Sequence, residues 1–353
     1  MCLVSGFTIK QILTPKIMKN YQYFIGIDVS KNELDFSLIE SNKVLFHLEV
    51  SNDKKGIEQF IKQIKTQYKD FSMDKCLFCL EHTGIYNNPL LNYLHEKKAD
   101  VWLEQATQIK SSMGVSREKN DKVDSQRIGL YAYKNREDVK LWTPKREIII
   151  KIDRLTALRE RLVKTIKTLK TPFSDAEGLV DKTLLKSEIA LCQTSINALK
   201  KDLDAVDKKI RELIDADPQL KELFDIVDSV KGIGQVIATE ILITTNEFKD
   251  INDPKKYACY SGFAPFVQSS GKYKGKSKVS NKANKKVKAL MHNAAMSAIQ
   301  YCQEIKEYYN RKIAEGKNKM LIINNICNKL VHRIFACFSR REKYKEIYTP
   351  TLV

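Results

Sequence analysis

Two acidic residues stand at the ends of apolar, β-rich runs, where a carboxylate needs a specific reason to be. Asp28 closes the run that begins at Tyr23, and Glu81 closes the run that begins at Leu77. A carboxylate on a central strand is costly to desolvate unless a cation or hydrogen bonds compensate it. Asp28 is therefore either a metal ligand or phosphate-handling residue, or an acid that lies at a strand end in water, and Glu81 repeats its pattern.

Two further acids, Asp121 and Asp124, stand where a helix is expected to begin. Their i, i+3 spacing places both carboxylates on one helix face. Acids in a first helical turn also have a simpler use, because they stabilise the helix dipole. Two strand ends and a helix start can meet at one edge of a sheet, and this favours a site that all four acids share.

Such a site suits phosphoryl transfer. Magnesium prefers hard oxygen ligands, and two ions about 4 Å apart can hold the attacking and the leaving oxygen of the reaction. Four carboxylates without ions would repel one another. An empty site should therefore be poorly ordered or have raised pKa values.

The segments that carry these acids alternate between strand and helix patterns from residue 23 to about 135. Apolar runs bounded by turns predict strands at 23–28, 34–39, 44–50, 76–81 and 99–103. Between them, a helix carries Ile57, Phe60, Ile61 and Ile64, another begins at Pro89, and a third begins at about Lys122. Three hairpin-like strands followed by this alternation predict an α/β sheet with helices packed on it.

The middle of the chain has a different pattern. A heptad-like seam of apolar residues runs from Leu185 to Leu213. An earlier helix is expected to end before Pro172, and it carries Leu155, Leu158, Leu162, Ile166 and Leu169. The two helices either fold back as an antiparallel hairpin or join another subunit. This region carries no catalytic signal.

A Gly-x-Gly turn follows, in Val230-Lys231-Gly232-Ile233-Gly234. Such a turn between two helices exposes backbone N–H groups at a helix N-terminus, which is a good place for a phosphate. The segment resembles a helix-hairpin-helix contact to the DNA backbone, although a plain tight turn has the same pattern. Lys231, Gly232 and Gly234 are therefore predicted nucleic-acid contacts.

The composition favours a polyanionic partner. The 353 residues carry a formal net charge of +18, and 43% of them are hydrophobic, as expected for a folded basic protein. The eight cysteines include one C-x-x-C motif, formed by Cys76 and Cys79. Because side chains alternate along a strand, these two should lie on opposite faces, where they could not share an ion. We interpret all eight cysteines as reduced thiols, which suits a cytoplasmic protein. The sequence has no membrane-span pattern, and residues 1–20 are not a convincing signal peptide. These features predict a cytoplasmic, nucleoid-associated protein of bacterial type.

The segment 254–303 contains neither Asp nor Glu. Its lysines alternate with aromatic residues, a composition that suits phosphate contacts and base packing. The predicted contacts are Lys272, Lys274, Lys276, Lys278, Lys282, Asn284, Lys285 and Lys288. Ser269 and Ser270 lie at the centre of this segment, in a predicted loop between Pro265 and Gly275. A serine there can be an ordinary turn residue, although lysine-rich surroundings would also stabilise an alkoxide or a phosphoserine.

The acidic motifs and the serine motif together resemble a known family. Gly26-Ile-Asp28-Val-Ser30-Lys31, Glu81-His-Thr-Gly84 and Asp121-Lys-Val-Asp124 stand in the order of a RuvC-like DEDD domain. Tyr260-Ser-Gly262, Ser269-Ser270-Gly271 and Ser280-Asn-Lys-Ala283-Asn284 are similar to a serine-bearing C-terminal transposase domain. The chain from Tyr21 onward thus resembles the DEDD transposases of the insertion-sequence one-ten family, relatives of the Piv DNA invertases.

The resemblance implies a mechanism that composition does not give. Asp28, Glu81, Asp121 and Asp124 would bind Mg²⁺, and Ser270, with Ser269 in reserve, would form a covalent phosphoserine link to DNA. The family also implies a structured bridge RNA that selects donor and target DNA. It further implies a homo-oligomer, a dimer or tetramer, in which subunits share sites.

The resulting prediction has four segments. They are an N-terminal extension (1–20), a RuvC-like mixed-sheet domain (21–145), coiled-coil helices (146–225) and a mostly helical C-terminal transposase domain (226–345). A Holliday-junction-resolving nuclease would need the four acids but no serine. An actin-like ATPase or sugar kinase shares Gly26-Ile-Asp28 but needs a Gly/Thr-rich phosphate turn, which does not follow here. A non-catalytic DNA-binding coiled-coil protein would tolerate loss of all four acids.

Overall fold

The structure, a computed structural model, describes residues 19–113, 120–266, 269–270, 273–275, 278–279 and 283–345. The expected N-terminal extension therefore lies outside the described residues except for its last two. The chain forms two compact units, which divide between Pro144 and Lys145. Among the described residues, no helix combines the length and the apolar character needed to cross a membrane.

The first unit is built on a five-stranded mixed sheet with the strand order β3-β2-β1-β4-β5. The strands are β1 (Tyr23–Val29), β2 (Glu33–Glu40), β3 (Lys43–Ser51), β4 (Cys76–Glu81) and β5 (Asp100–Glu104). β1, β2 and β3 pair antiparallel, whereas β4 pairs parallel with β1 and β5 parallel with β4. All five predicted strands are present, and the predicted mixed α/β sheet with helices packed on it is confirmed.

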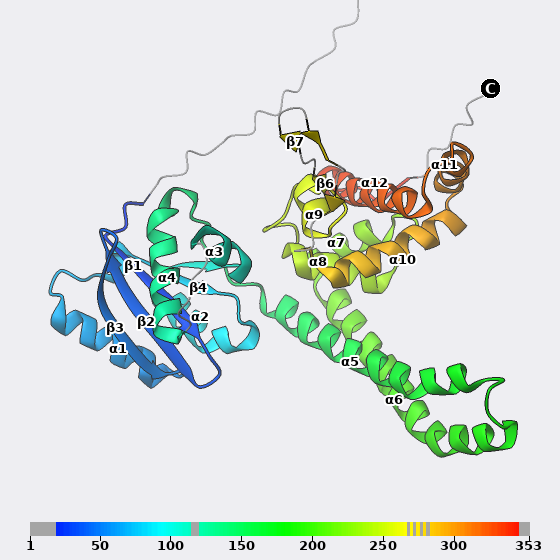
Figure 1. Cartoon of the computed structure of the whole chain (residues 1–353), viewed down its shortest axis with the longest axis horizontal. Helices are drawn as coiled ribbons and strands as arrows, with labels where there is room; N and C mark the ends of the chain where they lie inside the picture. The colour runs from blue at the N-terminus through cyan, green and yellow to red at the C-terminus, as the bar shows by residue number, and fades with distance from the viewer. Residues whose placement is uncertain are drawn as a thin grey trace, which may run out of the picture. The chain divides into compact units, whose positions relative to one another are not determined.

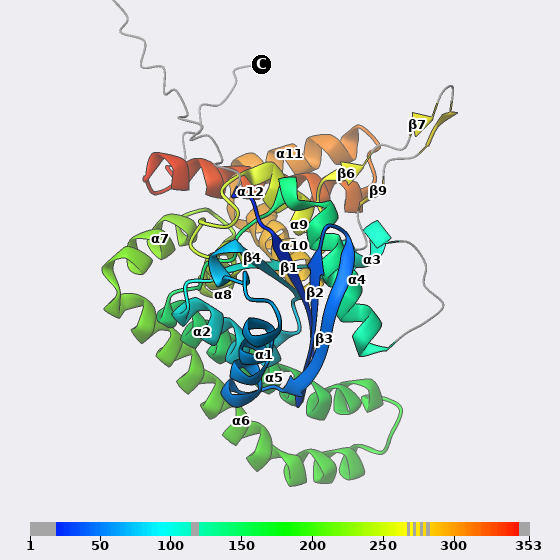
Figure 2. The same cartoon turned by 90° about the vertical axis from the view of Figure 1, so that its left-hand side faces the viewer.

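Helices cover both faces of this sheet (Figures 1 and 2). On one face, α1 (Lys54–Gln67) and α2 (Asn88–Glu96) pack against odd-numbered β1 residues such as Ile25. On the other face, α3 (Ala106–Met113) and α4 (Asp121–Lys134) pack against Phe24 and its neighbours. The sequence pattern did not predict α3. Short 3₁₀ turns complete the unit at η1 (Met73–Lys75), η2 (Gly84–Asn87) and η3 (Arg136–Asp138).

The two cysteines of the C-x-x-C motif illustrate the strand alternation. Cys76 packs in the core under α1 and α2, whereas Cys79 packs in the core under α4. Both cysteines are buried. Every cysteine among the described residues is a free thiol. The predicted placement of the two side chains on opposite faces of the strand is therefore confirmed.

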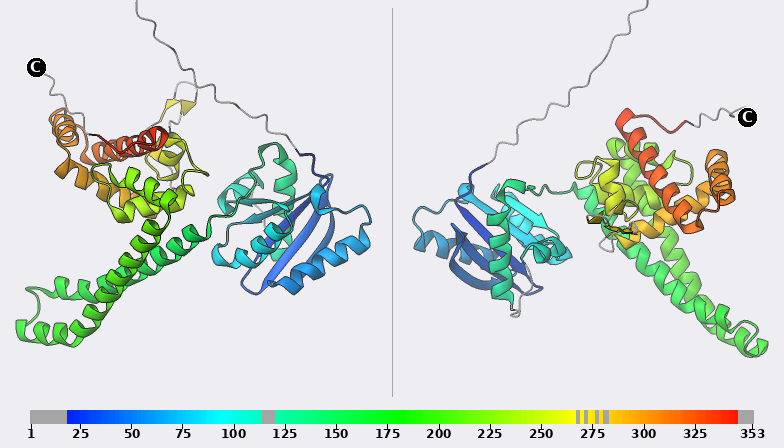
Figure 3. Two further views of the ribbon diagram at one scale, coloured as in Figure 1. Left: turned by 180° about the vertical axis from the view of Figure 1, so that it is seen from behind. Right: turned by 45° about the horizontal axis from the view of Figure 1, so that its top comes forward.

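The second unit begins with two long helices, α5 (Glu147–Ala176) and α6 (Lys182–Ala216), which lie side by side as an antiparallel hairpin (Figures 1 and 3). The apolar seam thus packs within one chain. The predicted end of the first helix before Pro172 is wrong, because α5 continues to Ala176. Pro172 removes one backbone hydrogen bond, but it is exposed in the last turns of the helix, so water can solvate the carbonyl group that loses its partner.

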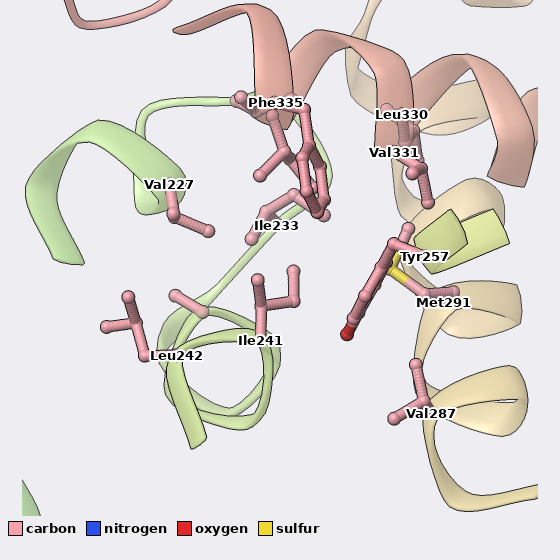
Figure 4. Close-up of a cluster of buried hydrophobic side chains, with 14 of the residues drawn as sticks. Val227, Ile233, Ile241, Leu242, Tyr257, Val287, Met291, Leu330, Val331 and Phe335 are labelled. Atoms are coloured by element: carbon pink, nitrogen blue, oxygen red, sulfur yellow. The ribbon is translucent and has the colours of Figure 1, made fainter. Parts of the chain in front are cut away.

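The remaining helices form a single apolar core with the base of the hairpin. They are α7 (Pro218–Asp228), α8 (Gln235–Thr245), α9 (Pro254–Tyr260), α10 (Lys285–Tyr301), α11 (Gln303–Ala314) and α12 (Lys319–Arg340). Figure 4 shows Tyr257 of α9, Met291 of α10 and Phe335 of α12 in this core beside Ile233 and Ile241. Two-residue strands between α9 and α10 pair as β6 (Pro265–Phe266) with β9 (Lys278–Val279) and β7 (Ser269–Ser270) with β8 (Tyr273–Lys274).

An ion-pair network anchors the start of the hairpin to this core. The Arg146 guanidinium donates hydrogen bonds to Glu247, at 2.5 and 2.9 Å, and to Asp217, at 2.7 and 3.2 Å. Burial raises the pKa of Glu247, but the hydrogen bonds from Arg146 and Lys249 outweigh it, so the pKa is lowered overall. Hydrogen bonding to Arg146 likewise lowers the pKa of Asp217, which caps α7.

Candidate active site and nucleic-acid interface

Asp28 and Glu81 lie side by side at one end of the sheet. The parallel register of β1 and β4 pairs Ile27 with Leu80, and each acid is the next residue of its strand. Strand alternation then places both carboxylates on the face that α4 covers. Asp35 lies opposite Asp28 on β2 and is buried. Its carboxylate is hydrogen-bonded to the His47 ring, with 2.9 Å between Oδ1 and Nε2. Asp35 is therefore held in a separate pair.

A contact between two glycines brings α4 onto this end of the sheet. A Cβ atom on Gly26 would lie 2.1 Å from the Ser125 carbonyl oxygen and 2.2 Å from the Gly129 nitrogen. Only a glycine at residue 26 therefore lets the helix backbone approach so closely. The buried hydroxyls of Ser37 and Ser125, 2.8 Å apart, fix the position of the helix along β2.

The first turn of α4 carries Asp121 and Asp124, as the sequence predicts. The N-cap is Asn120, whose side chain accepts a hydrogen bond from the Val123 N–H at 2.8 Å. Because Asn120 performs the capping, neither acid is needed as the cap. Arg127, one turn further, lies 3.8 Å from the Asp124 carboxylate.

The four acids form one electrostatic cluster. Burial raises the pKa of Asp28 to about 6, and repulsion from Asp121, Asp124 and Glu81 adds to the rise. Burial also raises the pKa of Glu81; Asp124 adds to this rise, while Lys110 and Arg127 oppose it. Burial is the largest cause of both shifts, and repulsion from neighbouring acids adds to it.

The donor set of this cluster consists only of carboxylate oxygens, which suits a hard divalent cation. Within the described ranges, no three acidic, histidine or cysteine side chains already point at a common position where an ion would sit. Binding an ion would require side-chain rotation on a fixed backbone.

The turn after Glu81 is fixed by side-chain amides that the sequence analysis missed. Asn87, which is buried, donates a hydrogen bond to the Glu81 carbonyl oxygen at 2.9 Å. Asn52 donates to the Ser30 carbonyl oxygen at 2.8 Å and to the Tyr86 carbonyl oxygen at 3.0 Å. These contacts join the ends of β1 and β4. An asparagine directly after a strand or turn is a weak sequence signal for this role.

Ser269 and Ser270 lie in the second unit, in β7, which pairs with β8 so that Ser270 is opposite Tyr273. The predicted loop is thus in part a short antiparallel ladder. The side chains of both serines, and Gly271 and Lys272 entirely, lie outside what the structure describes. Lys276 and Lys282 also fall outside the described residues, and only the backbone is described for Lys274 and Lys278.

The predicted glycine turn lies between α7 and α8. Gly232 has a φ of +93°, and a Cβ there would lie 2.6 Å from the Ala294 carbonyl oxygen of α10, so this glycine has a packing role. Gly234 is the N-cap of α8 and is exposed, as is Lys231. These two residues therefore remain available to a phosphate.

The start of α10 has both structural and exposed polar residues. The Asn284 side chain accepts from the Val287 N–H at 3.1 Å and donates to the Tyr260 hydroxyl at 2.7 Å, so both ends of its amide serve the fold. Lys285 is exposed and Lys288 is partly exposed. The neighbouring Lys286 pairs with Glu160 and, at 2.5 Å, with the buried Glu240.

Comparisons with known proteins agree with this two-part arrangement. Residues 25–176 match a family model described as "Transposase", of the DEDD type, and residues 225–310 match one described as "Transposase IS116/IS110/IS902 family". A pilin gene-inverting protein of Moraxella bovis is 24% identical over 326 residues, which cover 91% of this chain and 97% of the relative. An IS116 protein of Streptomyces clavuligerus is 23% identical over 158 residues, 43% of this chain and 38% of that protein.

Among solved structures, the chain is similar to that of T. thermophilus RuvC in complex with a Holliday junction substrate. It shows 12% sequence identity and a TM-score of 0.27, and the match covers 35% of this chain and 100% of the RuvC chain.

Proposed function

The chain belongs to the IS116/IS110/IS902 family of transposases, and on this premise we propose that it cleaves and rejoins DNA at the ends of an insertion element and at a target. The pilin gene-inverting relative, by its name, inverts a gene, and it matches this chain over nearly the full length of both proteins. A relative of that kind favours recombination over cleavage alone.

The observation that carries the proposal is the convergence of Asp28, Glu81, Asp121 and Asp124 on one end of the sheet. Three separate elements bring them there, and the pKa of Asp28 is raised by burial and by the other three carboxylates. Folding places like charges together at a cost in free energy, and a ligand of opposite charge would remove that cost.

The ion that we propose is Mg²⁺, held by the four carboxylates. When bound, it would supply positive charge to the non-bridging oxygens of the scissile phosphate and lower the pKa of an attacking oxygen. The chain itself contributes a fixed backbone, since the Gly26–Gly129 contact and the Asn87 hydrogen bond hold the acid-bearing elements in place.

For the covalent step, we propose that the Ser270 Oγ attacks the scissile phosphorus. An Oγ–P bond forms, the P–O bond to the departing strand breaks, and the departing oxygen takes a proton while the serine loses one. A second strand would reverse the exchange and release the serine. Support comes from the family motif and from the acid-free, lysine-rich segment that surrounds β7.

The partners that we propose are DNA, a structured guide RNA and further copies of the chain. The net charge of +18 supports contact with nucleic acid. Exposed apolar side chains near the closed end of the α5–α6 hairpin, Leu179 and Leu191, support contact with a second copy. The guide RNA rests on the family resemblance alone.

The proposal is tested by trapping a covalent adduct on DNA that carries the element end, with its RNA and Mg²⁺. Wild type is compared on a denaturing gel with Ser270→Ala, Ser269→Ala and Asp28→Ala. We expect a protein–DNA band that is lost in Ser270→Ala and Asp28→Ala and that chelation of the metal abolishes. Cleavage that persists in both serine variants without an adduct would instead indicate a water-driven, resolvase-like nuclease.

A matched control separates the acidic site from a general loss of acidic charge. Asp100 begins β5 at the opposite end of the sheet and pairs with Lys19 at 2.6 Å. Asp100→Asn removes the same charge from the same sheet, and we expect it to leave adduct formation unchanged.

A further inference from the structure

The last helix of the second unit, α12, carries no acidic side chain. Residues 316–341 contain neither Asp nor Glu but six lysine and arginine residues, so they form a second acid-free stretch after 254–303. The transposase family model that matches the second unit ends at residue 310 and does not include this helix. The charge of α12 is therefore a feature of this chain outside the part that matches the family.

The two sides of α12 differ in chemistry. Its inner side packs in the core of the second unit through apolar residues such as Ile326, Leu330 and Phe335. Figures 1 and 2 show the helix at the edge of that unit. The exposed residues recur at intervals of three or four, which places them on one helix face. They form the α12 stripe, which consists of Leu321, Asn325, Lys329, His332, Ala336 and Arg340.

The ammonium group in the middle of the α12 stripe is held in place by an aromatic ring. Lys329 Nζ lies 4.6 Å from the centroid of the Tyr308 ring on α11. The guanidinium carbon of Arg311 lies 5.8 Å from the same ring centroid. A ring attracts a cation but leaves its charge intact. Lys329 and Arg311 are both exposed, so two cations flank one ring at the α11–α12 surface.

The acids of the neighbouring helix are engaged by other side chains. α11 and its C-cap contribute three glutamates to this side of the unit. Each has a polar partner within 2.9 Å, namely Arg333 for Glu304, Gln303 for Glu307 and Lys312 for Glu315. An exposed face that serves solubility alone usually mixes both signs of charge along its length. The α12 stripe has only cationic and neutral side chains, which complements a polyanion.

We propose that the α12 stripe binds duplex DNA, with Lys329 and Arg340 on phosphate oxygens. At about 1.5 Å per residue, residues 325–340 extend over about 22 Å, which is the length of about six base pairs. The small side chain of Ala336 between the two cations lets the helix approach the duplex closely. Phosphate contacts fix position without reading sequence, so α12 would hold the DNA while the acids and the serine act on it.

Duplex DNA fits this surface better than duplex RNA does. The major groove of B-DNA admits an α-helix, whereas the major groove of A-form RNA is too narrow for side chains to enter. The inference rests on the proposed function, because it takes the bound duplex to be the DNA that is cleaved and rejoined.

The test measures binding of the full-length protein to a short mixed-sequence DNA duplex by fluorescence anisotropy at several salt concentrations. Asp28→Asn serves as the background, so that the DNA is not cleaved. In this background, Lys329→Gln with Arg340→Gln should weaken binding about tenfold at about 0.1 M salt. The slope of log K against log salt should fall in magnitude by about 1.8, about 0.9 for each lost phosphate contact. Lys329→Arg with Arg340→Lys should keep both the affinity and the slope.

The matched control removes the same net charge from another exposed helix face. Lys62 and Lys65 are exposed on α1 in the first unit. We expect Lys62→Gln with Lys65→Gln to bind DNA as the background protein does. A second measurement does not depend on affinity. A photoreactive benzoylphenylalanine in place of Ala336 should crosslink to the DNA on irradiation, whereas the same residue in place of Lys62 should not.

Failure of this inference can be told apart from failure of the proposed function. If wild type forms no cleaved product or adduct with element DNA, the proposed function fails. If wild type cleaves, but the glutamine variant of the α12 stripe loses no more affinity or salt dependence than the α1 control, the inference is refuted while the proposed function stands. Loss of affinity for an RNA duplex of the same length, with DNA binding unchanged, would also overturn it, as would the lack of a crosslink from residue 336.

Discussion

Replacing Asp28 by asparagine should make the metal-free protein more stable at neutral pH. The side chain of asparagine has nearly the same shape but carries no charge. In wild type, burial and the neighbouring Asp121, Asp124 and Glu81 disfavour the ionised form of Asp28 and raise its pKa to about 6. The substitution removes this unfavourable charge, although it removes a proposed metal ligand at the same time.

The magnitude follows from the pKa. A rise from 3.8 to about 6 corresponds to about 3 kcal/mol for a group cut off from water. Because the Asp28 side chain is half-buried, solvent screening reduces the expected gain to about 1–2 kcal/mol. The folded-state pKa lies above the unfolded one, so the penalty is absent below about pH 4, grows between about pH 4 and 6, and is complete above that range.

The assay is urea denaturation followed by tryptophan fluorescence in the presence of a chelator. Both tryptophans, Trp102 and Trp142, lie in the first unit, so the signal reports on the unit that carries the acids. Asp28→Asn should unfold at higher urea than wild type at pH 8 and at the same urea at pH 4. Asp100→Asn, which loses its pair with Lys19, should gain nothing.

With added Mg²⁺, wild type should become more stable than Asp28→Asn, because a bound ion stabilises the folded state that holds it. Wild type should gain stability with rising Mg²⁺, whereas Asp28→Asn should gain much less. The electrostatic reasoning would be refuted if Asp28→Asn were less stable than wild type at pH 8 without metal. A stability difference that stayed constant between pH 4 and 8 would refute it equally.

Two further predictions concern the elements that position the site and the second unit. Gly26→Ala should push α4 away from β1, because its Cβ would lie 2.1 Å from the Ser125 oxygen. We expect a loss of about 1–3 kcal/mol in the free energy of unfolding, measured by tryptophan-monitored denaturation, and no adduct formation. Wild-type activity in this variant would contradict the proposed role of the contact. Arg146→Gln should leave the buried Glu247 without its main partner and destabilise the second unit by about 2–3 kcal/mol in helix circular dichroism. That cost should shrink as the pH falls through the lowered pKa values of Glu247 and Asp217, and a loss independent of pH would argue for packing instead.

The strands of the first unit could be predicted because each is a short apolar run between turns. The spacing of apolar residues and the turn residues are local properties, so they can be recognised in the sequence without knowledge of the fold. The helix α3 was missed because its eight residues carry only a weak apolar pattern. The end of α5 was predicted wrongly at Pro172, since the rule that proline ends a helix weakens where the freed carbonyl group faces water.

The candidate site was only partly readable. Asp28 and Glu81 stand out because an acid after an apolar strand is unusual, and the parallel pairing of β1 with β4 puts them together. The approach of α4 depends on Gly26 and Gly129, which are far apart in the sequence and individually unremarkable. The role proposed for Ser270 came from resemblance to a family, since a serine before a glycine in a lysine-rich segment also suits an ordinary turn.

The placement of the acids explains why substitutions there can be interpreted as effects on chemistry. The four carboxylates lie at strand and helix ends, whereas the cores on both faces of the sheet are made of apolar residues such as Phe24 and Phe78. Removing a carboxylate therefore takes away repulsion and creates no cavity in either core. Loss of DNA cleavage in such a variant, together with equal or greater stability without metal, would be evidence for a role in catalysis and not in folding. Gly26→Ala should show a different combination, with activity and stability lost together.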